Sequence, residues 1–288
     1  SSPIDRRPKF HLYQPNIALI SGIAWDHINV FPTYENYVEQ FEIFIGKITN
    51  GGILVYNEED AEVKRVSKEA TNPIRKLPYH TPKYTVSNGV TLLETPEGDM
   101  PIEVFGAHNL NNLAGAKWIC QNMGVDEAEF YEAIASFKGA SKRLEKIAES
   151  KTKVAYKDFA HSPSKVAATT KAVKEQYPNR TLIACLELHT YSSLNAAFLK
   201  EYEGALEYAD KAVVFYSPDA VKIKKLDEVS YDQIAAAFNR KDLIIYTNPI
   251  EFKDFLFKQD FDNSALLLMS SGNYGGLNFD EVKGLILD

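Results

Sequence analysis

Two asparagines at the start of an expected helix are well suited to bind a ligand. Asn109 and Asn112 are three positions apart and follow His108, so the two amides share one helix face. An amide carries both donors and acceptors, which suits the edge of an adenine ring. Asn and His also cap helices, and capping accounts for the same residues. The stretch therefore indicates either a site for a nucleotide base or an ordinary helix start.

A basic pair and a strand-end carboxylate come next along the chain. Arg143, preceded by Lys142, offers a planar fork that fits phosphate oxygens, although a lone basic pair is usually a solvated surface feature. Asp158 ends an expected strand, where a carboxylate can accept hydrogen bonds from ribose hydroxyls. His161 follows, in a turn that ends with a Ser-Pro helix start. Local structure explains the Ser-Pro pair, and the other residues suit a nucleotide clamp.

Asp26 and His27 directly follow the apolar run 17–23, which predicts a buried strand. Side chains at the carboxyl end of such a strand project into the crevice where α/β proteins bind ligands. A neutral imidazole can hold a cation there, oriented by a neighbouring carboxylate. On residue type alone, a turn histidine bonded to backbone is the simpler interpretation.

A glycine-rich loop, residues 270–276, follows the last expected strand. Its backbone N–H groups can approach an anion, and Glu187 and His189 follow another strand end that faces the same crevice. An ordinary strand exit has the same composition. The chain contains no Gly-x-x-x-x-Gly-Lys-Ser/Thr loop, so the usual seat of the ATP phosphates is missing.

The elements that position these residues alternate between short apolar runs and amphipathic segments, which predicts an α/β fold. Residues 74–105 alternate and are rich in turns, which predicts antiparallel strands. The charged segment 145–153 is the expected linker and divides the chain into domains 1–148 and 149–288. The second domain repeats strands and helices as a doubly wound, Rossmann-like fold does. Strands are expected at 17–20, 53–56, near 154, 182–185, 212–215, 243–246 and 265–269, and helices at 38–48, 110–118, 126–136, from 163, 194–208, 231–238 and 249–257.

Composition limits the class of protein. The 288 residues suffice for about two soluble domains. A net charge of −7 without a long basic tract argues against nucleic acid and anionic membranes as partners. No apolar stretch is long enough to cross a bilayer, and no signal pattern opens the chain. Cys120 and Cys185 lie far apart in apolar runs, which predicts buried thiols in a reducing cytoplasm.

In this order and at these spacings the motifs resemble those of the Mur ligase family. The resemblance is carried by residues 108–116, 137–143 and 158–163, and it extends over essentially the whole chain. It implies a cytoplasmic, ATP- and Mg²⁺-dependent ligase of peptidoglycan biosynthesis or recycling, which joins UDP-N-acetylmuramate to an amino group. Residues 1–148 would be the C-terminal part of the central ATP-binding domain, and residues 149–288 the C-terminal domain that carries the amine.

The resemblance also implies roles for single residues. ATP would be bound by His108, Asn109, Asn112, Arg143 and Asp158, the amine substrate by His161, His189, Ser271 and Asn273, and a Mg²⁺ ion by His27. No catalytic residue is assigned with certainty. Segments 5–10, 26–32 and 269–276 are most similar to the branch that attaches the tripeptide L-Ala-γ-D-Glu-meso-diaminopimelate. A branch that adds L-alanine, and more distantly a folylpolyglutamate synthetase-like enzyme, remain open.

The sequence departs from the family pattern at two positions in these motifs. Ser162 stands where the branch usually has a second His, and Lys142 where Arg is common. The sugar-nucleotide domain, the phosphate loop and a metal-binding Glu of the family are expected before Ser1, so this chain alone should not catalyse ligation. The alternative from another class is a non-catalytic module that binds nucleotide or peptide.

Overall fold

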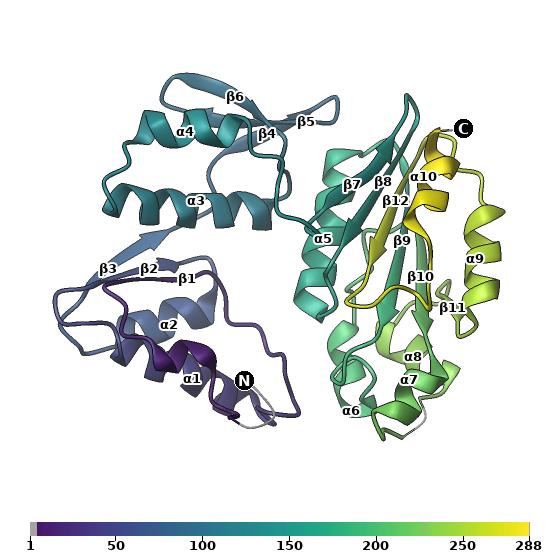
Figure 1. Cartoon of the computed structure of the whole chain (residues 1–288), viewed down its shortest axis with the longest axis horizontal. Helices are drawn as coiled ribbons and strands as arrows, with labels where there is room; N and C mark the ends of the chain where they lie inside the picture. Colours follow the sequence, from purple (N-terminus) through teal and green to yellow (C-terminus); the bar gives the residue numbers. More distant parts are fainter. Residues whose placement is uncertain (1–4, 228, 288) are drawn as a thin grey trace. The chain divides into compact units, whose positions relative to one another are not determined.

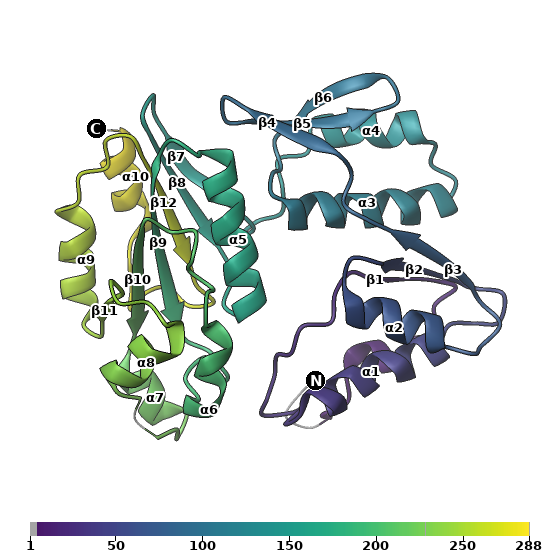
Figure 2. The same ribbon diagram turned by 180° about the vertical axis from the view of Figure 1, so that it is seen from behind.

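The computed structural model describes residues 5–227 and 229–287. The chain forms two compact units, unit 1 from Ser1 to Phe137 and unit 2 from Lys138 to Asp288 (Figures 1 and 2). The division falls before the expected boundary at residue 148, because the expected linker is structured. Residues Glu145–Glu149 are strand β7, which pairs antiparallel with β8 (Lys153–Asp158). An edge strand carries charged side chains for the same reason as a linker, since both face water.

Unit 1 begins with a small parallel sheet of strand order β1-β2-β3. The parallel pairing of β3 corrects the antiparallel strand expected from residue 74, because a helix between β2 and β3 provides the crossover. That helix, α2, was not recognised in the sequence because Val63 and Val66 are its only buried apolar residues, too few to show a period. The elements are β1 (Ile17–Ile20), α1 (Tyr34–Gly46), β2 (Ile53–Asn57), α2 (Ala61–Glu69) and β3 (Arg75–Tyr79), with a short 3₁₀ helix, η1, at Lys9–Leu12.

The rest of unit 1 is an antiparallel meander with two helices, and this part of the expectation for residues 74–105 is confirmed. The helix α3 lies between the meander and the parallel sheet and packs on both (Figure 1). Gly115 permits the close approach, because a Cβ there would lie 3.0 Å from the ring of Tyr79. The elements are β4 (Tyr84–Ser87), β5 (Val90–Thr95), β6 (Gly98–Ile102), α3 (Ala107–Asn122) and α4 (Glu127–Ala135).

Unit 2 is built on one sheet of strand order β11-β10-β9-β12-β8-β7, parallel except for β7. The helices α9 and α10 cover one face of the sheet and α5 covers the other (Figures 1 and 2). The expected α/β, Rossmann-like architecture is confirmed. The elements are α5 (Pro163–Gln176), β9 (Thr181–Leu188), α6 (Ala196–Leu199), η2 (Lys200–Tyr202), β10 (Lys211–Tyr216), α7 (Pro218–Ile223), α8 (Tyr231–Phe238), β11 (Ile244–Tyr246), α9 (Pro249–Phe257), β12 (Ser264–Met269) and α10 (Phe279–Leu287).

One expected helix of unit 2 is largely absent. Residues 194–208 contain only the short α6 and η2, followed by turns. Gly204 has a φ of +73°, a left-handed conformation that ends a helix.

In unit 2, β12 inserts between β8 and β9, so the carboxyl ends of these three strands adjoin. Within the described part of the chain, the helices are all too short or too polar to cross a membrane.

Candidate functional site

The carboxylate at the end of β8 is buried and bonded to backbone. The Asp158 residue is only 6% exposed. Its Oδ1 accepts the N–H of Ala160 and its Oδ2 accepts the N–H of Leu144, each at 2.6 Å. Both oxygens of the carboxylate that the family resemblance assigns to ribose are therefore engaged within unit 2 itself.

The basic turn, residues 141–144, lies against this strand end. Lys142 and Leu144, which flank Arg143, have φ values of +58° and +42°. The carbonyl of Lys142 accepts the N–H of Phe159 at 2.8 Å. The exposed guanidinium of Arg143 lies 5.6 Å from the centre of the Phe159 ring, a cation–π contact. The turn thus presents Arg143 at the surface while its two neighbours are fixed.

His161 lies in the turn between β8 and α5 and is mostly buried. Its Nδ1 is 2.8 Å from the carbonyl oxygen of Phe159, and its ring meets the Phe159 ring edge-on at 5.1 Å. Its own carbonyl accepts a hydrogen bond from the hydroxyl of Tyr202. These contacts fix the turn that leads into α5.

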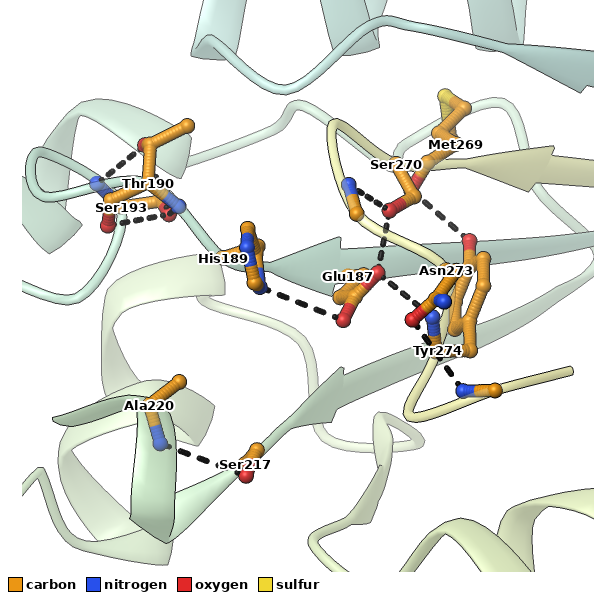
Figure 3. Close-up of polar contacts among 12 residues, drawn as sticks. Glu187, His189, Thr190, Ser193, Ser217, Ala220, Met269, Ser270, Asn273 and Tyr274 are labelled. Carbon is orange, nitrogen blue, oxygen red and sulfur yellow. Dashed lines mark hydrogen bonds and ion pairs between the residues drawn. The ribbon is translucent and has the colours of Figure 1, made fainter. Parts of the chain in front are cut away.

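At the ends of β9 and β12, Glu187 lies between His189 and the 270–274 loop (Figure 3). The Glu187 carboxylate is buried and accepts hydrogen bonds from the Ser270 hydroxyl and from the N–H of Tyr274, the latter at 2.8 Å. His189 is 42% exposed, and its Nδ1 is 3.6 Å from Glu187 Oε1. Glu187 is thus the hub of this cluster, a residue that the sequence placed at the crevice without a role.

Gly272 sits directly over this pair. A Cβ at Gly272 would lie 2.8 Å from Glu187 Oε2 and 3.0 Å from His189 Cγ, so a larger residue would force these side chains to move. Tyr274 anchors the loop, since its buried hydroxyl lies 2.7 Å from the carbonyl of Cys185. Burial raises the pKa of Tyr274 well above its ordinary value, which keeps this donor protonated.

The remaining two loop residues predicted to bind substrate differ in exposure. Asn273 is exposed, and its Oδ1 accepts the N–H of Gly276 at 3.2 Å. The buried hydroxyl oxygen of Ser271 has no hydrogen-bond partner within the described residues. The structure therefore brings His189, Ser271 and Asn273 together with Glu187 at the carboxyl ends of β9 and β12.

In unit 1 the predicted nucleotide residues lie on the first turns of α3. Gly106, with a φ of +87°, is the N-cap, and no side chain caps this helix. The alternative in which His108 or the asparagines cap α3 is therefore wrong. Asn109 donates from Nδ2 to the carbonyl of Phe105 at 2.9 Å, whereas Asn112 is exposed.

The residue between them, Asn111, is one the sequence interpretation missed. It is buried, and its Nδ2 lies 3.2 Å from Asn57 Oδ1, 3.0 Å from Glu59 Oε2 and 3.2 Å from Thr81 Oγ1. These partners lie at or just beyond the carboxyl ends of β2 and β3. The sequence carries no signal that separates Asn111 from Asn109 and Asn112, because all three lie in the first two turns of the same helix.

His27 has a φ of +90° and follows β1. Its Nδ1 lies 2.9 Å from Asp26 Oδ1, and its side chain is 59% exposed. This is the arrangement of a carboxylate that orients a metal-binding imidazole. The described residues hold no cluster of three or more His, Cys, Asp or Glu that could enclose a metal, so His27 offers a single ligand.

Comparison with known proteins gives matches to one family. The family model for the Mur ligase middle domain matches residues 4–120. A UDP-N-acetylmuramate–L-alanine ligase from Caldicellulosiruptor bescii is 28% identical over 217 residues, which are 71% of this chain and 47% of that enzyme. Residues 4–120 of this chain are therefore similar to the middle domain of Mur ligases, and the chain as a whole is similar to enzymes of that family. It spans about half the length of that curated relative.

Solved structures share the fold of both units. A murein peptide ligase from Psychrobacter arcticus has a TM-score of 0.63 and 17% identity, with 99% of this chain and 61% of that chain covered. The ligase MurF from Thermotoga maritima, solved with ADP, has a TM-score of 0.65 and 17% identity over 94% of this chain and 61% of its own. At these identities the likeness shows the fold alone.

Proposed function

We propose that this chain supplies the nucleotide-facing and amine-facing parts of an ATP-dependent ligase in peptidoglycan metabolism. ATP phosphorylates the carboxylate of UDP-N-acetylmuramate to an acyl phosphate. The amino group of the second substrate then attacks the acyl carbon, and phosphate leaves. The main support is the match of residues 4–120 to the Mur ligase middle domain. No side chain caps helix α3 of that domain, and His108 and the exposed Asn112 lie in its first two turns.

The nucleotide roles follow from exposure and charge. Asn112 presents its amide at the surface of α3, where it can pair with the edge of the base beside His108 and Asn109. Arg143 presents an exposed guanidinium, which suits phosphate oxygens. For a Mg²⁺ ion, His27 would supply one nitrogen ligand, as the resemblance implies, and the nucleotide phosphates and water would supply the oxygen ligands that this cation prefers. Bound there, the ion would neutralise charge on the transferring phosphoryl group.

For the amine we propose the tripeptide L-Ala-γ-D-Glu-meso-diaminopimelate, which would place the enzyme in cytoplasmic recycling of the cell wall. The support is the local likeness of segments 5–10, 26–32 and 269–276 to that branch, and a polar strand edge with His189, Ser271 and Asn273. The second candidate is L-alanine, favoured by the curated relative from Caldicellulosiruptor bescii. His161, packed against Phe159, would border the amine site.

The test supplies the complete protein that contains this chain with ATP, Mg²⁺, UDP-N-acetylmuramate and both amines at equal concentration. We expect phosphate release coupled to the tripeptide product, identified by mass. Faster incorporation of L-alanine would make the alanine-adding ligase the correct assignment. Nucleotide binding without any amide product would instead favour a non-catalytic binding module.

Single variants test the nucleotide roles. Arg143→Ala and Asn112→Ala should each reduce ATP affinity or turnover by roughly tenfold to a hundredfold, because each removes a contact in a desolvated site. Lys151→Ala is the matched control for charge, since Lys151 is exposed in the turn between β7 and β8, at the end of β8 away from Asp158. Unchanged ATP kinetics in both variants would refute the roles.

A further inference from the structure

The end of β8 and the basic turn, residues 141–144, are built as one piece. We propose that Asp158 is a positioning residue, whose carboxylate holds this turn in shape so that Arg143 meets the nucleotide phosphates. The ligand of Arg143 rests on the proposed function above. The shape of the turn rests only on contacts within unit 2.

The hydrogen bonds of Asp158 connect the basic turn to the chain that leaves β8. Leu144 N–H and Ala160 N–H each lie 2.6 Å from one of its oxygens, and the residue is 6% exposed. A hydrogen bond from an N–H group to an ionised carboxylate is about twice as strong as a neutral one. The carboxylate therefore joins the residue after Arg143 to the chain that leaves β8.

The backbone of the turn has an unfavourable conformation that needs support. Lys142 and Leu144 both have left-handed φ values, +58° and +42°, which are costly for residues with a side chain. Such a conformation persists only where the surroundings hold it. Here Phe159 N–H donates to the Lys142 carbonyl at 2.8 Å, and Lys142 N–H donates to Glu145 Oε2 at 2.8 Å.

Arg143 has a fixed backbone and a guanidinium that faces solvent. Its backbone N–H donates to the Ala140 carbonyl at 3.1 Å, and its guanidinium lies over the Phe159 ring. The flanking residues are thus fixed while the guanidinium faces solvent. A side chain on an ordered turn loses less conformational entropy when it binds, so fixing the turn raises affinity without a direct contact from Asp158.

Hydrogen exchange on this chain tests the clamp without any nucleotide. Asp158→Asn keeps one acceptor oxygen but turns an NH₂ group toward the other N–H donor. We expect the Leu144 or Ala160 amide to exchange at least about tenfold faster. The control is Asp210→Asn, because Asp210 Oδ2 likewise accepts a backbone N–H, that of Leu182, at 2.7 Å, but at the amino end of β9, away from the turn. Unchanged exchange at Leu144 and Ala160 in Asp158→Asn would overturn the proposal.

ATP and its 2′-deoxy and 3′-deoxy analogues, measured on the complete protein, separate a clamp from a ribose ligand. For a clamp, Asp158→Asn lowers the affinity for all three nucleotides by one common factor, roughly threefold to a hundredfold, and adds no further loss to Arg143→Ala. A ribose ligand would instead lose its preference for ATP over one deoxy analogue in the variant, and that result would overturn the proposal. If Arg143→Ala leaves ATP affinity unchanged, the proposed nucleotide role of Arg143 fails, while amide exchange still decides the clamp.

Discussion

Unit 1 and unit 2 both bury polar groups at the carboxyl edge of a parallel sheet, but they use them differently. In unit 1 the buried Asn111 bonds to other side chains, those of Asn57, Glu59 and Thr81. In unit 2 the buried carboxylates of Asp158 and Glu187 accept backbone N–H groups, and Glu187 also accepts the Ser270 hydroxyl.

Hydrogen bonds to side chains and hydrogen bonds to backbone have different consequences for the two units. Side-chain bonds from α3 to the ends of β2 and β3 connect a helix to a sheet, so we expect them to contribute to the stability of unit 1. Bonds from a carboxylate to backbone determine the path of the following loop, so unit 2 uses them to place Arg143 and the 270–274 loop. Each half of this comparison can be broken by a single substitution.

The largest effect is expected in unit 1. Asn111→Ala should lower the free energy of unfolding of unit 1 by about 2–4 kcal/mol, because it removes a buried amide with three side-chain partners, of which Asn57 is itself buried. Urea unfolding followed by tryptophan fluorescence measures this unit alone, since both tryptophans, Trp25 and Trp118, lie in it.

Asn112→Ala is the matched control, one position along the same helix and exposed. It should change the stability by less than about 0.5 kcal/mol. Equal losses in the two variants would show that the network around Asn111 does not attach α3.

A smaller effect is expected at the loop of unit 2. Gly272→Ala should cost about 1–3 kcal/mol, because the new methyl group meets Glu187 and His189 at 2.8–3.0 Å. The measurement is hydrogen exchange at the Tyr274 amide, which donates to Glu187. The neighbouring Ser271→Ala should be neutral, since within the described residues its buried hydroxyl oxygen has no partner. A Tyr274 amide that keeps its protection in Gly272→Ala would show that the loop does not need glycine there.

The smallest effect concerns acid. A hydrogen bond from Lys157, 2.9 Å away, is the main cause that holds the pKa of Glu145 below its usual 4.5. A carboxylate with a depressed pKa stabilises the fold above pH 4.5, and this contribution is lost as the pH falls through the folded-state pKa. Because the pair is partly exposed, we expect at most about 1 kcal/mol.

Native-state hydrogen exchange of unit 2 amides at pH 7 and about pH 3 checks this acid dependence. Glu145→Gln should lose stability at neutral pH and show a weaker dependence on acid than the wild type. The exposed Glu207→Gln serves as the control. An unaltered acid dependence in Glu145→Gln would show that Glu145 does not contribute to the pH dependence of stability.

The sequence by itself predicted the α/β class, the doubly wound unit 2 and the Mur ligase family. The helices at 231–238 and 249–257 agree with α8 and α9, because Ser230 and Pro249 mark their starts by local chemistry. The strands β9, β10 and β12 were evident for a related reason. A strand covered on both faces reads as a continuous apolar run.

Only the tertiary structure decided features that depend on distant partners. Whether residues 145–149 are a linker or an edge strand depends on pairing with β8, and β3 is parallel because it meets β2. The sequence could not tell Asn111 from Asn112 as buried or exposed, because both flanks of α3 are covered by other parts of unit 1. Asp158 likewise looked available to a ligand until the fold brought Leu144 N–H to its oxygen, since a hydrogen bond between segments forms only when packing brings them together.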